Sequence, residues 1–250
     1  MSAQVQTHKA SKAKRKPLKR YVTGLADRSF GTEATPGIVT TSVTLFGGEP
    51  GTGKSTFFLQ LLQAIYALTE RPGVFVSDES EAQVRDRAAR LGVDARAVLV
   101  LKGEQIDREM LKRLKPSVIF DDRGRRTGLL DLIHRYRMLA QAEKTPFFIG
   151  WQMTKSEDFA GDVECQHAAD TLLRMFLACE IQSADKRVHH PPRHRREQGA
   201  VSRFRVLSCL KARFGDGDSE SYWLMGKNGL VPWQVPKPEG SARKAGGKRA

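Results

Sequence analysis

Residues 48–55 read Gly48-Glu49-Pro50-Gly51-Thr52-Gly53-Lys54-Ser55 and match the phosphate-loop pattern G-x-x-x-x-G-K-S/T. A β-branched stretch precedes the loop and an amphipathic stretch follows it, which is the strand–loop–helix context that the pattern requires. The glycines allow backbone N–H groups to turn inward around phosphates, Lys54 can reach the terminal phosphates, and Ser55 can ligate Mg²⁺. We therefore expect Gly48–Thr56 to bind ATP with Mg²⁺. The alternative, a Gly-rich turn with a solvated lysine, is disfavoured by the flanking segments.

The sequence around the loop alternates between strand-like and helix-like segments. The strand-like segments are short and rich in β-branched or aromatic residues: Val39–Phe46, Val74–Ser77, Ala97–Leu101, Ser117–Asp121 and Pro146–Gly150. The helix-like segments are Lys54–Leu68, Glu81–Leu91, Asp107–Leu114 and Leu129–Ala142. This alternation predicts an α/β fold with a mostly parallel sheet and helices on both faces. After Arg203 the pattern changes, and Phe204–Leu210 with Ser221–Met225 predicts a C-terminal β-hairpin.

Positive charge is concentrated in three runs of the sequence. The formal net charge is +14, and residues 1–20 contribute seven Lys/Arg without any acid. Residues 185–200 and 234–250 hold five Lys/Arg each and account for the rest of the excess. Such runs are either solvated disorder or arms that bind polyanions, and we favour nucleic acid because mobile positive charge grips phosphates independently of sequence. We expect one domain over 23–233 between basic disordered tails at 1–22 and 234–250.

The composition argues against several other classes of protein. No run of eighteen apolar residues occurs and no apolar stretch follows the basic start, so we expect neither a membrane span nor a secretory signal. Three cysteines lie far apart without a CxxC pair, which argues against a zinc ribbon and fits a reducing cytoplasm: Cys165, Cys179 and Cys209. His189, His190 and His194 have no carboxylate or thiol at ligand spacing, so a solvated basic loop is favoured over a metal site.

Two acidic positions are candidates for the chemistry of hydrolysis. A phosphate loop needs a carboxylate at the end of a buried strand to hold Mg²⁺ through water. Asp121, after Val118-Ile119-Phe120, is our candidate, with Asp122 as its neighbour. The alternative is a strand-end acid that caps the next turn. Glu79 follows Val74–Ser77 at the carboxyl edge of the predicted sheet and is a candidate to orient water, although a carboxylate at a helix N-terminus is equally compatible with its position.

Four blocks of the sequence, in chain order, resemble the ATPase core of the RadA/Sms branch of the RecA superfamily. They run from the region of the phosphate loop to the predicted hairpin: Leu25-Ala26-Asp27-Arg28-Ser29-Phe30-Gly31 with Gly47–Thr56; Val76-Ser77-Asp78-Glu79-Ser80 with Gln83, Arg87-Ala88 and Arg90-Leu91-Gly92; Met153-Thr154-Lys155 with Ala160-Gly161, His167 and Ala169–Leu172; and Lys211-Ala212-Arg213-Phe214-Gly215. The likeness covers roughly residues 24–232. Most phosphate-loop proteins lack the fourth block, so it makes the resemblance specific.

The resemblance implies a RecA-like phosphate-loop core and roles for particular residues. Glu79 would activate the attacking water, and Gln152 would sense the γ-phosphate at the end of the fifth strand. Residues 155–164 would form a DNA-facing loop. Lys211 and Arg213 would act on ATP held by a neighbouring subunit, neutralising charge on the transferring phosphoryl group, which implies a homo-oligomeric ring or filament. The alternative for Lys211 and Arg213 is a solvated strand end.

The sequence also departs from the family's pattern. The zinc ribbon that precedes this core in full-length members and the Lon-protease-like domain that follows it have no counterpart here, and the block around Asp78 is one residue short. After Asp121 the family's longer loop is replaced by a short basic one. Its arginines could face DNA in the lumen of a ring or could pair with acids of a neighbouring subunit: Arg123, Arg125 and Arg126.

Two functions follow as expectations. The first is an ATP-hydrolysing, DNA-dependent motor or recombination and repair factor, a helicase or translocase among its forms, that acts as an oligomer on single-stranded or branched DNA. The second is a nucleotide-dependent binding module that loads or regulates a replication or recombination partner with little hydrolysis. Lys54, Ser55, Asp121 and Glu79 together favour hydrolysis. A small-molecule kinase is disfavoured, because Lys211–Gly215 and the basic tails would have no task in it.

Overall fold

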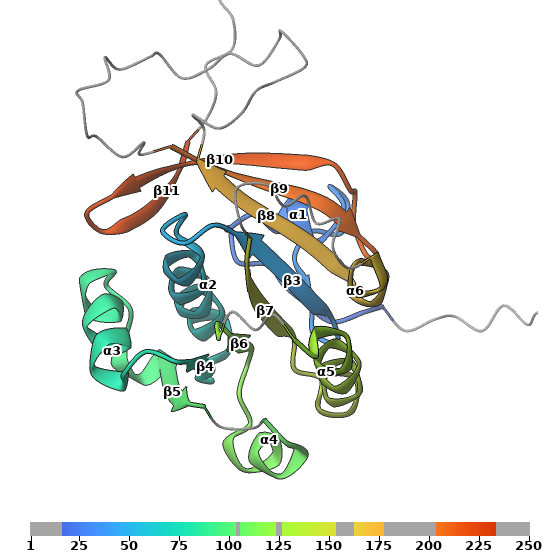
Figure 1. Ribbon diagram of the computed structural model, residues 1–250, viewed down its shortest axis with the longest axis horizontal. Coiled ribbons are helices and arrows are strands. Elements are labelled where there is room, and N and C mark those ends of the chain that lie inside the picture. The colour runs from blue at the N-terminus through green and yellow to red at the C-terminus, as the bar shows by residue number, and fades with distance from the viewer. Residues whose placement is uncertain (1–16, 104–105, 124–126, 154–162, 178–203, 234–250) are drawn as a thin grey trace, which may run out of the picture.

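A nine-stranded sheet with the strand order β11-β10-β9-β8-β3-β7-β6-β4-β5 organises the chain. The computed structural model describes residues 17–103, 106–123, 127–153, 163–177 and 204–233 (Figure 1). The strands of the sheet are β3 (Val43–Gly48), β4 (Gly73–Ser77), β5 (Val98–Lys102), β6 (Ile119–Asp121), β7 (Phe147–Gln152), β8 (Thr171–Leu177), β9 (Phe204–Ala212), β10 (Ser219–Gly226) and β11 (Gly229–Trp233). A separate two-stranded sheet pairs β1 (Arg20–Tyr21) with β2 (Ile38–Val39).

The sheet has a parallel half and an antiparallel half. All pairings from β8 through β3, β7, β6 and β4 to β5 are parallel. The pairings of β8 with β9, β9 with β10 and β10 with β11 are antiparallel. The predicted mostly parallel α/β sheet and the predicted hairpin of β9 and β10 are therefore confirmed. The strands β8 and β11 extend that antiparallel half beyond the expectation.

Helices cover both faces of the sheet, as predicted. They are α1 (Asp27–Phe30), α2 (Lys54–Thr69), α3 (Glu81–Arg90), α4 (Arg108–Leu114), α5 (Leu129–Glu143) and α6 (Val163–Ala168), with a 3₁₀ turn at Ala95–Ala97. One apolar core lies between the sheet and the helices α2 and α3, and a second lies between the sheet and the helices α4, α5 and α6 (Figure 1). Successive residues of a strand point to opposite faces, so Phe46 and Phe120 belong to the α2 core while Leu45 and Ile119 belong to the α5 core.

The expected strand Val39–Phe46 is wrong in its first half. The chain turns at Thr40 and Thr41, because Ser42 bonds back to the carbonyl of Val39 through its N–H at 3.1 Å and its hydroxyl at 2.7 Å. Val39 ends β2, and β3 begins only at Val43. β-Branched residues on both sides of the turn conceal this break in the sequence pattern.

A strap formed by residues 20–37 ties the start of the domain to its C-terminal strands. Arg20 donates to the carbonyls of Gly37 at 3.0 Å and Phe214 at 3.1 Å. Gly31 and Gly215 cross in backbone contact, since a Cβ added to Gly215 would lie 2.8 Å from backbone atoms of Gly31. Strand β1 begins at Arg20 and therefore lies before residue 23, where we expected the domain to start.

Candidate nucleotide-binding site

The candidate phosphate loop connects the last residue of β3, Gly48, to the first residue of α2, Lys54. Thr52 closes a tight turn inside it, because its hydroxyl donates to the carbonyl of Glu49 at 2.9 Å. Gly53 has a φ of 107°, a left-handed conformation that disfavours any side chain, and an added Cβ would lie 2.7 Å from Cε of Met225. The backbone path thus requires glycine where the sequence pattern has it.

Lys54 lies along the inside of this loop and is 8% exposed. Its ammonium donates to the carbonyls of Gly48 at 2.7 Å and Glu49 at 3.1 Å. Burial lowers the pKa of Lys54, and the nearby carboxylates of Asp122 and Glu49 oppose that shift. The loop therefore holds a desolvated cation at the N-terminus of α2, where the helix dipole also favours anions.

The carboxylate beside Ser55 is that of Asp122. The Ser55 hydroxyl donates to Oδ2 of Asp122, while Asp121 accepts hydrogen bonds from the Tyr136 hydroxyl and from Nε of Arg123, both at 2.7 Å. We expected Asp121 to hold Mg²⁺ together with Ser55, but the structure places the carboxylate of Asp122 against Ser55 and that of Asp121 against Tyr136. The reason is strand alternation: Phe120 faces α2, so Asp121 faces α5 and Asp122 returns to the side of the loop.

Asp122 has an unusual ionisation for a carboxyl group. Burial raises the pKa of Asp122 to about 6. The hydrogen bond from Ser55 and the charges of Lys54 and Arg87 oppose the rise, whereas the charge of Glu79 adds to it. A half-buried carboxylate next to a hydroxyl supplies hard oxygen ligands, which fit Mg²⁺. Since Mg²⁺ binds through one or two carboxylates together with waters and substrate phosphates, the residues present suit it.

Glu79 lies near Asp122, between β4 and α3. The turn is fixed by a capping box, in which the side chains of Ser80 and Gln83 each bond to the other's backbone N–H. One carboxylate oxygen of Glu79 accepts a hydrogen bond from Arg87 of α3 at 2.9 Å. The other, Oε2, is buried and has no hydrogen-bond partner among the described residues. An orphaned buried carboxylate oxygen is a ready acceptor for water or a proton.

The remaining predicted catalytic positions lie in two different places. Gln152 ends β7 and pairs in register with Gly48, so its backbone adjoins the start of the loop. The structure does not describe its side chain or residues 154–162, which hold most of the expected DNA-facing loop. Residues 1–16, 185–200 and 234–250, which hold most of the basic runs, also lie outside the described residues, as do Arg125 and Arg126.

Lys211 and Arg213 lie towards the end of the sheet opposite to the end that carries the loop. Lys211 pairs with Leu172, beside the beginning of β3, whereas the loop leaves the far end of that strand. Three residue steps along β3, from Leu45 to Gly48, separate these levels by about 10 Å. The two cations are bonded within the chain. Lys211 donates to the carbonyls of Gln166, His167 and Ala169 at 2.6–3.0 Å, and Arg213 pairs with Asp170 at 2.8 Å.

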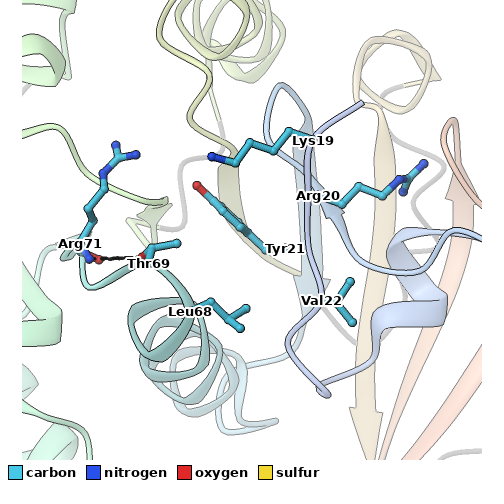
Figure 2. A pocket seen from close by; sticks show the side chains of 7 residues that line it. All are labelled: Lys19, Arg20, Tyr21, Val22, Leu68, Thr69 and Arg71. Carbon is cyan, nitrogen blue, oxygen red and sulfur yellow. Dashed lines mark hydrogen bonds between the residues drawn. The ribbon is translucent and has the colours of Figure 1, made fainter. Parts of the chain in front are cut away.

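A pocket of about 510 Å³ lies at the other end of α2, about 24 Å along the helix from the loop. Figure 2 shows Lys19, Tyr21 and Val22 on the β1 side and Leu68, Thr69 and Arg71 on the α2 side of this pocket. None of the predicted site residues lines it. The nucleotide site is therefore defined by the loop and its carboxylates and is separate from this hollow.

Sequence reasoning gave no role to three residues that contact the candidate site: Asp122, which bonds to Ser55, Arg87, which bonds to Glu79, and Arg205, which bonds to Thr52. Counting the alternation from Phe120 would have found Asp122. Arg87 lies eight residues after Glu79 on the following helix, a spacing without a fixed geometry in sequence. Arg205 bonds to a residue 153 positions away, so no local pattern could reveal it.

The mostly parallel α/β sheet and the phosphate-loop motif are typical of phosphate-loop ATPases, and comparison with known families agrees with this class. The model of the KaiC ATPase family matches residues 19–106, which include the loop, Glu79 and Arg87. Over these residues, about a third of the chain, the sequence is similar to a KaiC-type ATPase domain. None of the helices in the described part of the chain has the length and apolarity that crossing a membrane requires.

The more particular resemblance, to RadA, is also confirmed. DNA repair protein RadA of Aquifex aeolicus (strain VF5) is 27% identical over 218 residues, which cover 81% of this chain and 44% of that protein. DNA repair protein RadA of Bacillus subtilis (strain 168) is 25% identical over 229 residues, covering 84% of this chain and 45% of that protein. The chain thus spans less than half the length of these curated relatives.

Proposed function

We propose that this protein is a Mg²⁺-dependent ATPase that works on DNA as an oligomer. The observation that carries the hydrolytic part is the convergence of Lys54, Ser55, Asp122 and Glu79 around one loop. Lys54 and the inward-facing N–H groups of the loop bind the phosphates. Ser55 and Asp122 would hold Mg²⁺, which would supply positive charge that neutralises the phosphates. Glu79 orients the attacking water and accepts its proton through the orphaned Oε2.

The oligomeric part rests on Lys211 and Arg213. Both lie at the edge of the sheet away from the loop of their own chain, so they can contact ATP only across an interface between two copies. A head-to-tail arrangement of this kind generates a ring or a filament. There the two cations would offset charge on the phosphoryl group of the neighbour's nucleotide.

The DNA partner is proposed from charge and from relatives. Residues 1–20 carry seven Lys/Arg and no acid, which suits a phosphate grip without sequence preference. The relatives named above are DNA repair proteins, and we propose single-stranded or branched DNA in repair or recombination as the setting here. The engagement of Lys211 by three carbonyls of its own chain favours a second candidate, a nucleotide-dependent loader or regulator with little hydrolysis.

A steady-state ATPase assay with and without single-stranded DNA separates the two candidates. A motor hydrolyses ATP faster with DNA, whereas a loader binds ATP and turns it over slowly under both conditions. The variant Glu79→Gln should bind ATP normally and lose at least about 100-fold in rate, because the general base is gone. Glu81→Gln is the matched control, since Glu81 pairs only with exposed Arg85 in the described part of the chain and should keep the wild-type rate. Full hydrolysis by Glu79→Gln would contradict the assignment.

A further inference from the structure

Arg205 is a buried cation in the antiparallel half of the sheet. It is the second residue of β9 and is only 4% exposed. Moving a guanidinium out of water is costly unless its donors are satisfied in good geometry. A buried arginine at a strand position that an apolar residue could fill therefore calls for a reason in the structure.

The guanidinium of Arg205 bonds directly to the candidate phosphate loop. Its Nε donates to the carbonyl of Thr52 at 2.6 Å, and Nη1 donates to the carbonyl of Phe204 at 3.1 Å. Thr52 is itself 1% exposed, so water cannot replace this donor readily. Hydrogen bonds from charged donors to carbonyls in a dry setting are among the stronger ones.

Fixing the Thr52 carbonyl also fixes the next amide. In a planar trans peptide the C=O and the following N–H point in opposite directions. If Arg205 holds the oxygen of Thr52 on its own side, the N–H of Gly53 must point away from Arg205. Gly53 has a φ of 107° and little torsional preference of its own, so contacts to Thr52 help to set this peptide plane.

Neighbouring contacts hold the same end of the loop against the C-terminal strands. Leu230 of β11 exchanges two backbone hydrogen bonds with the side chain of Gln60 on α2, at 2.8 and 2.9 Å. Cε of Met225 lies against Gly53, where a Cβ would be 2.7 Å away. Packing thus locates the loop, and Arg205 is a charged group bonded to one of its peptides.

We propose that Arg205 is a positioning residue for nucleotide binding, which presets the Thr52–Gly53 peptide so that its N–H faces the phosphates. The inference rests on the proposed function of the loop. It predicts that Arg205 acts on ATP affinity and on KM rather than on the rate of the bound complex, because the guanidinium touches the loop and not the reacting atoms.

The test compares Arg205→Gln and Arg205→Lys with the wild-type chain. Three properties are measured: the affinity for a non-hydrolysable ATP analogue by titration, KM and kcat for ATP, and the melting temperature. Arg205→Gln should weaken analogue binding and raise KM about tenfold, with kcat within about twofold of wild type. Arg205→Lys should recover part of the affinity. The matched control is Arg137→Gln, since Arg137 is also mostly buried and pairs with Asp170 at the far end of β3. That control should lower the melting temperature and leave analogue affinity unchanged.

The outcomes separate this inference from the proposed function. Wild type that binds no analogue overturns both. Wild type that binds, with unchanged affinity in Arg205→Gln or an equal loss in Arg137→Gln, overturns the role of Arg205 alone. If Arg205→Gln does not fold, Arg205→Lys decides: a several-fold weaker affinity at wild-type kcat supports the role, and wild-type affinity overturns it.

Discussion

At the scale of single residues, Asp121 and Asp122 show how one step along a strand changes the role of a carboxylate. Asp121 faces α5, is 2% exposed, and is held by Tyr136 and Arg123. Asp122 faces the loop and accepts from Ser55. The first therefore belongs to a buried ion pair, and the second is placed to serve the nucleotide.

These placements predict different failures for the two asparagine variants. Asp122→Asn should lose at least about 100-fold in ATPase rate at saturating Mg²⁺, because the proposed carboxylate ligand of the metal is gone. Asp121→Asn should mainly lose stability, by about 3 kcal/mol, because it leaves the Arg123 guanidinium without its buried counter-ion. ATPase assays and chemical denaturation check both. A rate lost in Asp121→Asn and kept in Asp122→Asn would reverse the assignment.

Much of the site could be predicted from sequence because its parts are local. The loop, Lys54 and Ser55 follow from a spacing pattern, and Glu79 follows from its place after an apolar strand. Identifying Asp122 required knowing which face of the sheet each residue of β6 points to. The sequence indicates this only through the alternation of Phe120 with its neighbours. Arg205 could not be predicted, because the Thr52 carbonyl that explains it is brought near only by the pairing of the strands.

At the scale of elements, the helices α2, α3, α4 and α5 were predictable, whereas the short helices α1 and α6 and the ends of the sheet were not. Helix α2 begins at Lys54 as expected, and α3 is announced by its capping box. Strand β8 departs from the expectation, in which Ala169–Leu172 is only part of a motif, although Thr171–Leu177 is apolar apart from Thr171 and Arg174. Strand β11 is short and contains Pro232, which is tolerated at the sheet edge that β11 occupies.

The link between α6 and β9 leads to a prediction about subunit sharing. If Lys211 serves the neighbour's nucleotide, a chain with Lys54→Ala loses its own nucleotide site but can still supply Lys211 to a neighbour. A chain with Lys211→Ala keeps its own nucleotide site but cannot supply Lys211 to a neighbour. Each variant alone should have about 5% of wild-type ATPase activity or less. Mixing them should restore a measurable fraction of activity, since some interfaces then join an intact loop to an intact Lys211.

The mixing experiment has its own control. Two variants of the same kind, Lys54→Ala and Ser55→Ala, both damage the loop and should not complement each other. Mixtures of Lys54→Ala with Lys211→Ala that stay as inactive as their parts would mean that Lys211 only caps α6 through the carbonyls of Gln166, His167 and Ala169. The loss in Lys211→Ala would then come from that helix.

At the scale of the whole molecule, the net charge of +14 is the dominant feature, and its effect on DNA should depend on salt. Residues 1–16 hold five Lys/Arg and lie before the first described contact of the chain. Deleting them should reduce the slope of log affinity against log salt for single-stranded DNA by up to about 3.5. Fluorescence anisotropy over a range of salt concentrations measures it. An unchanged slope would assign the run to another partner.

The strap of residues 20–37 limits how this protein can be recombined with its relatives. Arg20 bonds to Phe214, and Gly31 crosses Gly215 with no room for a side chain on either backbone. The two halves of this crossing are encoded almost two hundred residues apart. A chimera that takes residues 20–37 from one parent and Phe214 with Gly215 from another therefore joins two surfaces that did not evolve together. Chimeras should fold far more often when one parent supplies both of these parts. The crossover points then lie between Lys54 and Asp170.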